Sequence, residues 1–201
     1  MKPGYHPFRH FALITRHRHM VIANGFHCGI FFHCLRHDLS KYGFTEFFTS
    51  AHYYVGNRSP VYEERLQNGY FSRVCQHHTK RNKHHWEYWT DFFCGRIVVM
   101  TMPWVYATET VCDMLSASKN YNPKTFSGKT TLEYFEKHAK RYYMTKATYE
   151  YIHWCLERYR DLGFKGLKKK DTKAMYAEIT SKYPKTEMID SMRLCGDIIP
   201  A

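Results

Sequence analysis

The segment with the greatest potential for chemistry runs from His33 to Lys41 and reads HCLRHDLSK. In it, His37 and Asp38 place an imidazole and a carboxylate on adjacent residues, and Lys41 follows three positions after the Asp. Imidazoles and carboxylates bind first-row transition metals, and a lysine beside a metal can hold an anionic substrate. A lone His-Asp pair is usually a surface feature, so its meaning depends on what the rest of the chain supplies.

A long amphipathic helix over residues 8–35 is predicted by apolar side chains that recur at helical spacing. His17 falls on this apolar stripe, whereas His19 points about 200° around the helix from it. We therefore expect His17 to face the core. A single histidine on an apolar face is ordinarily a hydrogen-bonded core residue, but this helix ends just before His37 and Asp38, which gives His17 candidate partners.

A second cluster, from Tyr70 to Trp89, holds four histidines among basic and aromatic residues. If one helix runs through it, His78 and His85 share a face and His84 lies about 120° away from them. If the chain breaks near Asn82, His84 becomes available instead, so all three histidines remain candidate ligands. The alternative interpretation is a basic surface, bordered by aromatic rings, that binds nucleic-acid phosphates.

A strand over residues 94–102, as half of a small hairpin, precedes a predicted helix over residues 104–118. The helical spacing puts Glu109 and Asp113 one turn apart, at the edge of an apolar stripe. A carboxylate at the edge of a buried face needs a partner, and a metal ion is an adequate one.

The composition is that of a folded chain: 201 residues, 44% hydrophobic and 17% aromatic. The formal net charge of +12 favours anionic partners. The seven cysteines include no C-x-x-C pair, which argues against a disulfide framework and fits reduced thiols in a cytoplasm. No stretch of about 18 uninterrupted apolar residues occurs, so we expect neither secretion nor a membrane span.

The remaining segments predict further helices. Residues 39–69 are expected to form a turn, a short helix that starts at Thr45, and a loop in which Pro60 helps to end that helix. Residues 131–161 predict one or two helices, Asp171 is a candidate N-cap for a helix to Lys182, and Thr186 is expected to start a short last helix. The predicted fold is all-α with a minor β-hairpin, in which residues 1–118 form a helical core and 119–201 a helical C-terminal extension packed on it.

The order of His17, the His37-Asp38 pair, the later histidines and Asp113 resembles the ligand order of the HD-domain superfamily of metal-dependent phosphohydrolases. In that superfamily a helical core gathers one His, a His-Asp pair and a late Asp around a metal, and dinuclear branches insert further histidines. HDLSK (37–41) is similar to the H-D-x-G-K form of dinuclear branches, in which the Lys meets the substrate; Ser40 replaces the Gly. The patterns HxxxNKHHWxYW (78–89) and MPxxYxxExxxD (102–113) also resemble an uncharacterised bacterial and phage family related to HD proteins.

This resemblance implies an HD-type helical bundle that holds one or two divalent transition metals, Mn, Fe, Co, Ni or Zn. The implied ligands are His17, His37, Asp38, His78, His84, His85 and Asp113. With two metals, Asp38 would bridge them, and Lys41 and Lys83 would neutralise charge on a phosphoryl group.

Three functions remain open at this point. The first is a metal-dependent phosphohydrolase acting on a nucleotide or another phosphorylated small molecule. The second is a diiron oxygenase of the HD fold, because the same ligand pattern occurs there. The third is a non-enzymatic protein that binds nucleic acid through the basic cluster.

Overall fold

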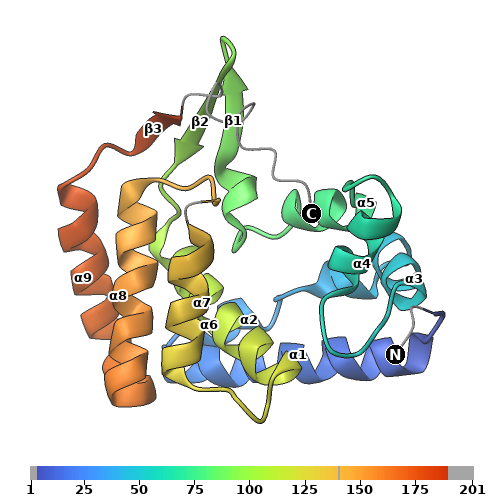
Figure 1. Ribbon diagram of the computed structural model, residues 1–201. Helices are drawn as coiled ribbons and strands as arrows, with labels where there is room; N and C mark the ends of the chain where they lie inside the picture. The colour runs from blue at the N-terminus through green and yellow to red at the C-terminus, as the bar shows by residue number, and fades with distance from the viewer. Residues whose placement is uncertain (1–3, 140, 190–201) are drawn as a thin grey trace.

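The computed structural model describes residues 4–139 and 141–189 and confirms a mostly helical fold with one small sheet (Figure 1). Helix α1 runs along one side of the molecule; α3, α4 and α5 gather near its N-terminal end, and α8 and α9 lie toward the other end. The N-terminal half contains α1 (Pro7–His27), α2 (Phe31–Cys34), the 3-10 helix η1 (Leu39–Tyr42), α3 (Phe44–His52), α4 (Pro60–Gln67) and α5 (Arg73–Thr79).

The C-terminal half contains four longer helices and the strands of the sheet. Its elements are η2 (Trp86–Trp89), β1 (Thr90–Phe93), β2 (Arg96–Met100), α6 (Trp104–Tyr121), α7 (Gly128–Ala139), α8 (Lys146–Leu162), η3 (Gly163–Leu167), α9 (Lys169–Ser181) and β3 (Thr186–Ile189).

Helix α1 is shorter than the sequence predicted. It begins with Pro7 in its first turn, which suits proline because the missing N–H has no partner there, and it ends at His27 instead of continuing to residue 35. Gly29 adopts a left-handed conformation (φ 71°), and the chain turns back so that Cys34 packs against α1. A Cβ added at Gly25 would lie 2.4 Å from the Cys34 Sγ atom, so this close approach requires glycine. The turn sends His37 and Asp38 back over the middle of α1.

Helix α6 packs along α1, and contacts at both ends set its position along the α1 axis. Val21 of α1 and Val111 of α6 are completely buried in the shared core, and Asn24 donates a hydrogen bond from Nδ2 to the Ser116 Oγ atom (2.9 Å). At the other end of the contact, the Arg16 Nε atom donates to an Asn120 side-chain oxygen. This pairing sets the turn of α6 that carries Asp113 opposite the turn of α1 that carries His17.

The C-terminal helices share one hydrophobic core with α1 and α6, since Phe135, Tyr151 and Ile179 belong to the same cluster of buried residues. The chain after α9 differs from the expected helix: Thr186–Ile189 is strand β3, which pairs antiparallel with β2. The sheet therefore has the order β1-β2-β3, and the C-terminal segment completes it. A partner strand 86 residues away is invisible to local sequence patterns, because the pairing is a tertiary contact.

Two predicted helix boundaries are also wrong. Pro60 starts α4, an unpredicted helix, where it occupies the first turn just as Pro7 does in α1. Helix α9 starts earlier than expected, with Lys168 at the N-cap position, so Asp171 lies inside the first turn. There its carboxylate still interacts favourably with the positive end of the helix.

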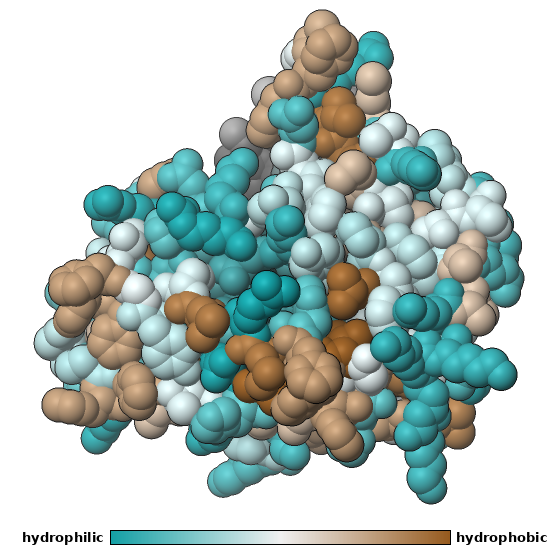
Figure 2. Space-filling view, turned by 180° about the vertical axis from the view of Figure 1, so that it is seen from behind, coloured by the Kyte–Doolittle hydropathy of each residue, from teal (hydrophilic) through white to brown (hydrophobic). Residues whose placement is uncertain are grey.

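Apolar and polar side chains alternate in patches on the surface. In Figure 2, brown patches lie along the lower part of this face, with teal side chains between them. Exposed aromatic residues are frequent on α1 and α3, among them Phe8, Phe11, Phe44 and Phe48. Within residues 4–139 and 141–189, no helix has the length and apolar character needed to cross a bilayer.

His10 gives the fold a pH dependence that does not involve the histidine cluster. Its ring is buried against Phe47 and Tyr54, and burial, with a smaller contribution from the charge of Lys41, lowers the pKa of His10 from 6.5 to about 4. A lowered histidine pKa means that the unfolded chain takes up the proton first, so stability is retained above pH 6.5 and is lost as the pH falls toward 4.

We expect a His10→Phe variant to lose less stability on acidification than the wild type. Between pH 7.5 and pH 5 the free energy of unfolding of the wild type should fall by about 2 kcal/mol more than that of the variant. Urea unfolding at the two pH values measures this difference, and all other histidines cancel in the comparison. An identical fall in both proteins would show that His10 is not held neutral.

Candidate metal centre

Four separate parts of the chain bring all seven predicted ligands together at one buried point. His17 comes from α1, His37 and Asp38 from the turn after α2, and Asp113 from α6. His78 comes from the end of α5, and His84 and His85 from the loop that follows it. Helix α5 ends before Asn82, so the second of the two predicted alternatives is correct, and both His84 and His85 reach the centre.

The backbone of Asp38 has an unusual conformation that directs its side chain inward. Asp38 is left-handed (φ 54°, ψ 25°), which costs energy for a residue with a side chain but is tolerated best by Asn and Asp. Its carbonyl accepts a hydrogen bond from the Lys41 N–H (3.0 Å), which closes the first turn of η1. The Arg18 Nε atom donates to the His37 carbonyl (3.2 Å) and ties this turn to α1. Strain of this kind is retained where the surrounding structure fixes it.

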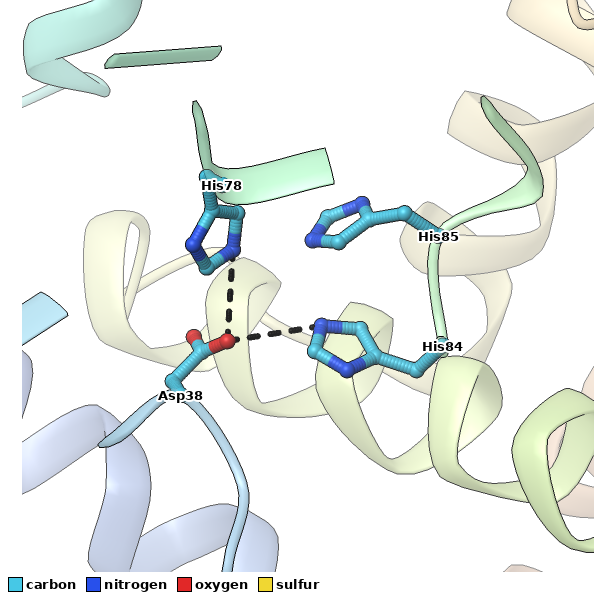
Figure 3. A group of neighbouring side chains, drawn as sticks. All are labelled: Asp38, His78, His84 and His85. Atoms are coloured by element: carbon cyan, nitrogen blue, oxygen red, sulfur yellow. Dashed lines mark ion pairs between the residues drawn. The ribbon is translucent and has the colours of Figure 1, made fainter. Parts of the chain in front are cut away.

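The two oxygens of Asp38 face two different sets of histidines. Oδ1 lies 3.2 Å from the His78 Nε2 atom and 3.5 Å from the His84 Nε2 atom, as the dashed lines in Figure 3 show. Oδ2 lies 3.2 Å from the His37 Nε2 atom and 3.8 Å from the His17 Nε2 atom. Asp38 is 2% exposed, so this carboxylate stands between two buried groups of nitrogen atoms.

The first group, which we call group A, consists of His17, His37 and Asp113. The His17 Nε2 atom lies 2.9 Å from Asp113 Oδ1 and 3.4 Å from the His37 Nε2 atom. The second, group B, consists of Asp38, His78, His84 and His85. Within each group, one ligand atom per residue lies within 4.8 Å of all the others, which is close enough to surround one ion.

Group B contains nitrogen atoms that the protein leaves unsatisfied. The Nε2 atoms of His78, His84 and His85 are buried and have no hydrogen-bond partner among the residues that the structure describes. Figure 3 shows the three rings converging on one side of the Asp38 carboxylate. Buried polar atoms are normally paired, because an unpaired one costs about 1–3 kcal/mol. Three such nitrogens beside a carboxylate oxygen fit the donor set of a transition metal.

Two buried glutamates hold the rings in these orientations. Glu109 accepts from the Nδ1 atom of His37 (2.8 Å) and also lies 3.4 Å from the Nδ1 atom of His84, so both Nε2 atoms face the centre. Its other oxygen pairs with the His33 Nε2 atom (2.6 Å). Carboxylates behind metal-binding histidines commonly fix the tautomer and the ring orientation in this way.

Glu46 does the same for His78, whose Nδ1 atom lies 2.8 Å from Glu46 Oε2, while Oε1 accepts from the His77 Nδ1 atom (2.6 Å). The sequence predicted a short helix in this region but gave no role for Glu46. One sequence feature could have pointed to Glu46: it lies one helical turn before Ser50, so both side chains share the buried face of α3.

The electrostatics of the centre keep its carboxylates ionised. Burial alone would raise the pKa of Asp38, but the charges of His37 and Lys41 hold it well below its usual value. Burial likewise opposes the ionisation of Asp113, and the hydrogen bond and charge of His17 keep its pKa low. Burial would lower the pKa of His37, whereas Asp38 and the hydrogen bond to Glu109 raise it to about 10. The carboxylates of Asp38 and Asp113 thus remain available as anionic ligands throughout the neutral pH range.

A cavity of about 440 Å³ opens onto Asp113. Tyr121 and Tyr134 line it, together with Ser59 and Thr131. Tyr121 lies close enough to Lys41 and Asp113 to feel both charges, and burial raises the pKa of its hydroxyl. The cavity therefore gives a small molecule access to the centre from the side of group A.

Lys41 lies beside the centre, with its Nζ atom 2.6 Å from Asp38 Oδ2 and about a third of its side chain exposed. The structure does not bring Lys83 to the same place. Its Nζ atom lies over the rings of Tyr88 (5.4 Å) and Tyr106 (5.7 Å), and it lines a different cavity. The backbone turns between Asn82 and His85, so that His84 points inward and Lys83 does not.

The family model for DUF5662, described as a family of unknown function, matches residues 6–158. The chain belongs to this family. Comparisons with curated proteins and with solved structures found no match. The matched region contains every ligand candidate as well as Glu46 and Glu109, so the whole centre lies inside the family's extent.

We expect the Glu109→Gln and Glu46→Gln variants to bind Mn²⁺ about 10- to 100-fold more weakly than the wild type, because the ring nitrogens lose their anionic partners. Isothermal titration calorimetry of the metal-stripped proteins measures the affinity. Glu133→Gln, on the exposed side of α7, is the matched control and should bind as the wild type does. Unchanged affinity in both site variants would mean that the two glutamates do not support metal ligands.

Proposed function

We propose that this protein is a metal-dependent phosphohydrolase with two divalent metal ions that share Asp38. One ion would be held by group A with Asp38 Oδ2, and the other by group B, which contains Asp38 Oδ1. The observation that carries the proposal is the division of the Asp38 oxygens between two sets of buried imidazoles. A single ion would leave one of these sets without a partner.

The donor set suits Mn, Fe, Co, Ni or Zn, because imidazoles and carboxylates together bind all of these ions. Bound metals of this kind polarise a phosphoryl oxygen and lower the pKa of a bound water, which supplies a nucleophile near neutral pH. The orienting carboxylates Glu46 and Glu109 support the assignment, because each turns at least one imidazole toward the centre through its Nδ1 atom.

The protein's own groups provide for an anionic substrate. The Lys41 ammonium group lies next to Asp38 and is partly exposed, so it can pair with a phosphoryl oxygen as charge develops there. The cavity of about 440 Å³ beside Asp113 is in the size range of sites for small organic molecules. The tyrosines that line this cavity can contact the organic part of a substrate. This favours a nucleotide or another phosphorylated small molecule over inorganic phosphate as the substrate.

The charge of the protein also favours an anionic small molecule as the substrate. The formal net charge of +12 draws anionic molecules toward the protein. The histidines of the second sequence cluster that point inward, His78, His84 and His85, are taken up by the centre and do not form a basic surface, which makes a phosphorylated small molecule a better-supported partner than nucleic acid.

We expect purified protein to contain close to two equivalents of a divalent transition metal and to hydrolyse phosphomonoesters. The Asp38→Ala variant should lose both properties together, with a fall in kcat/KM that exceeds the roughly 10- to 100-fold effect of an outer-shell change. Elemental mass spectrometry and a screen of p-nitrophenyl phosphate and nucleoside monophosphates provide the measurements. Asp161→Ala, on the exposed surface of α8, is the control.

Hydrolysis that survives Asp38→Ala in metal-free protein would contradict the proposal. Two irons with a coupled EPR signal and no phosphatase activity would instead identify an oxygen-dependent enzyme that uses the same ligands.

A further inference from the structure

A second cavity, of about 280 Å³, is lined in part by His84 and Glu109 and shares no lining residue with the cavity that opens onto Asp113. Three cationic side chains line it: Arg36 from the turn before His37, and Arg81 and Lys83 from the loop after α5. These residues are far apart in sequence, so the fold itself assembles the three charges around one hollow.

The three cationic side chains in this wall outnumber the one carboxylate, Glu109, among its described lining residues. Among the residues that the structure describes, no carboxylate forms an ion pair with Arg36, Arg81 or Lys83. The oxygens of Glu109 already pair with His33, His37 and His84.

The cationic groups are also free to bind. Within the part of the chain that the structure describes, the Arg81 side chain makes one hydrogen bond, from Nη1 to the His77 carbonyl (3.3 Å), which leaves its other donors available. Lys83 rests on the faces of Tyr88 and Tyr106, which hold the ammonium group in place without removing its charge. Guanidinium groups present paired N–H donors that match the oxygens of phosphate.

We propose that this cavity, which borders the metal centre at His84, binds a phosphate-sized oxyanion on its cationic side chains. The anion would be inorganic phosphate or the phosphoryl group of a small molecule, and Arg36, Arg81 and Lys83 would hold it. The site requires no metal, because its charge comes from groups that are cationic at every pH near neutrality. Phosphate binding at this cavity can therefore be tested separately from the phosphohydrolase activity.

Titration of inorganic phosphate into the full-length protein at low ionic strength, followed by isothermal titration calorimetry, tests the site. An Arg36→Gln/Arg81→Gln variant should bind phosphate about tenfold or more weakly, because two charge-assisted contacts are lost. The matched control is Arg73→Gln/Lys80→Gln, which removes two exposed charges near the same loop but outside the cavity, and it should stay within about twofold of the wild type.

A second titration with a nucleoside monophosphate separates the two sources of the anion. Tighter binding than phosphate, lost in the Arg36→Gln/Arg81→Gln variant, would assign the site to a phosphorylated small molecule. Equal binding would assign it to free phosphate. If the double variant is misfolded by circular dichroism, Lys83→Met, which keeps an apolar stem over the two rings, replaces it with the same expected weakening.

Two results would overturn the proposal. Equal weakening in the cavity variant and the control would show that phosphate responds only to diffuse surface charge. Unchanged binding in the cavity variants, with binding abolished by Asp113→Asn, would show that phosphate binds only at the metal centre.

Discussion

The structure is organised around one buried carboxylate. Asp38 is almost inaccessible to solvent and ionised, and a buried charge is tolerated only where other groups compensate for it. Here the compensation comes from both sides, from histidines on α1, on α5 and in the loop after α5, and from the ammonium group of Lys41. The left-handed backbone at Asp38 is part of the same arrangement, because it turns the carboxylate from the surface turn into this position.

Around Asp38 the groups are arranged in layers. The inner layer consists of the remaining ligand candidates, and the outer layer of Glu46 and Glu109, which fix the rings from behind. The packing of α6 on α1 holds Asp113 against His17, and the same helix α6 carries Glu109 one turn earlier. One helix thus supplies both a ligand candidate and an orienting carboxylate, so the geometry of the centre depends directly on the α1–α6 contact.

The sequence predicted the inner layer better than the outer one, for a physical reason. Helical phase correctly picked His17 rather than His19, since His17 is buried and His19 is exposed. His-Asp adjacency and the spacing of Glu109 and Asp113 are local features that survive any tertiary arrangement. Whether His84 or His85 points inward depended on where α5 ends, and the sequence could only leave both open.

What the sequence missed depends on long-range contacts. Glu46 gains its role only because α3 packs beside α5, and β3 is a strand only because β2 lies next to it. Even Gly29, whose left-handed backbone ends α1, gave too weak a signal against the apolar periodicity that continues beyond it. The fold class was therefore predictable from local pattern, whereas the outer layer of the centre required the three-dimensional structure.

The most direct test of a centre in which two ions share Asp38 is a crystal structure of the protein grown with Mn²⁺ or Zn²⁺, with anomalous diffraction used to locate the ions. Two ions that share Asp38 would give two anomalous peaks, one beside each of its oxygens. We expect His17, His37 and Asp113 around the first and His78, His84 and His85 around the second. A single peak would contradict the sharing of Asp38 by two ions, and the absence of any peak at saturating metal would show that the cluster of histidines is structural.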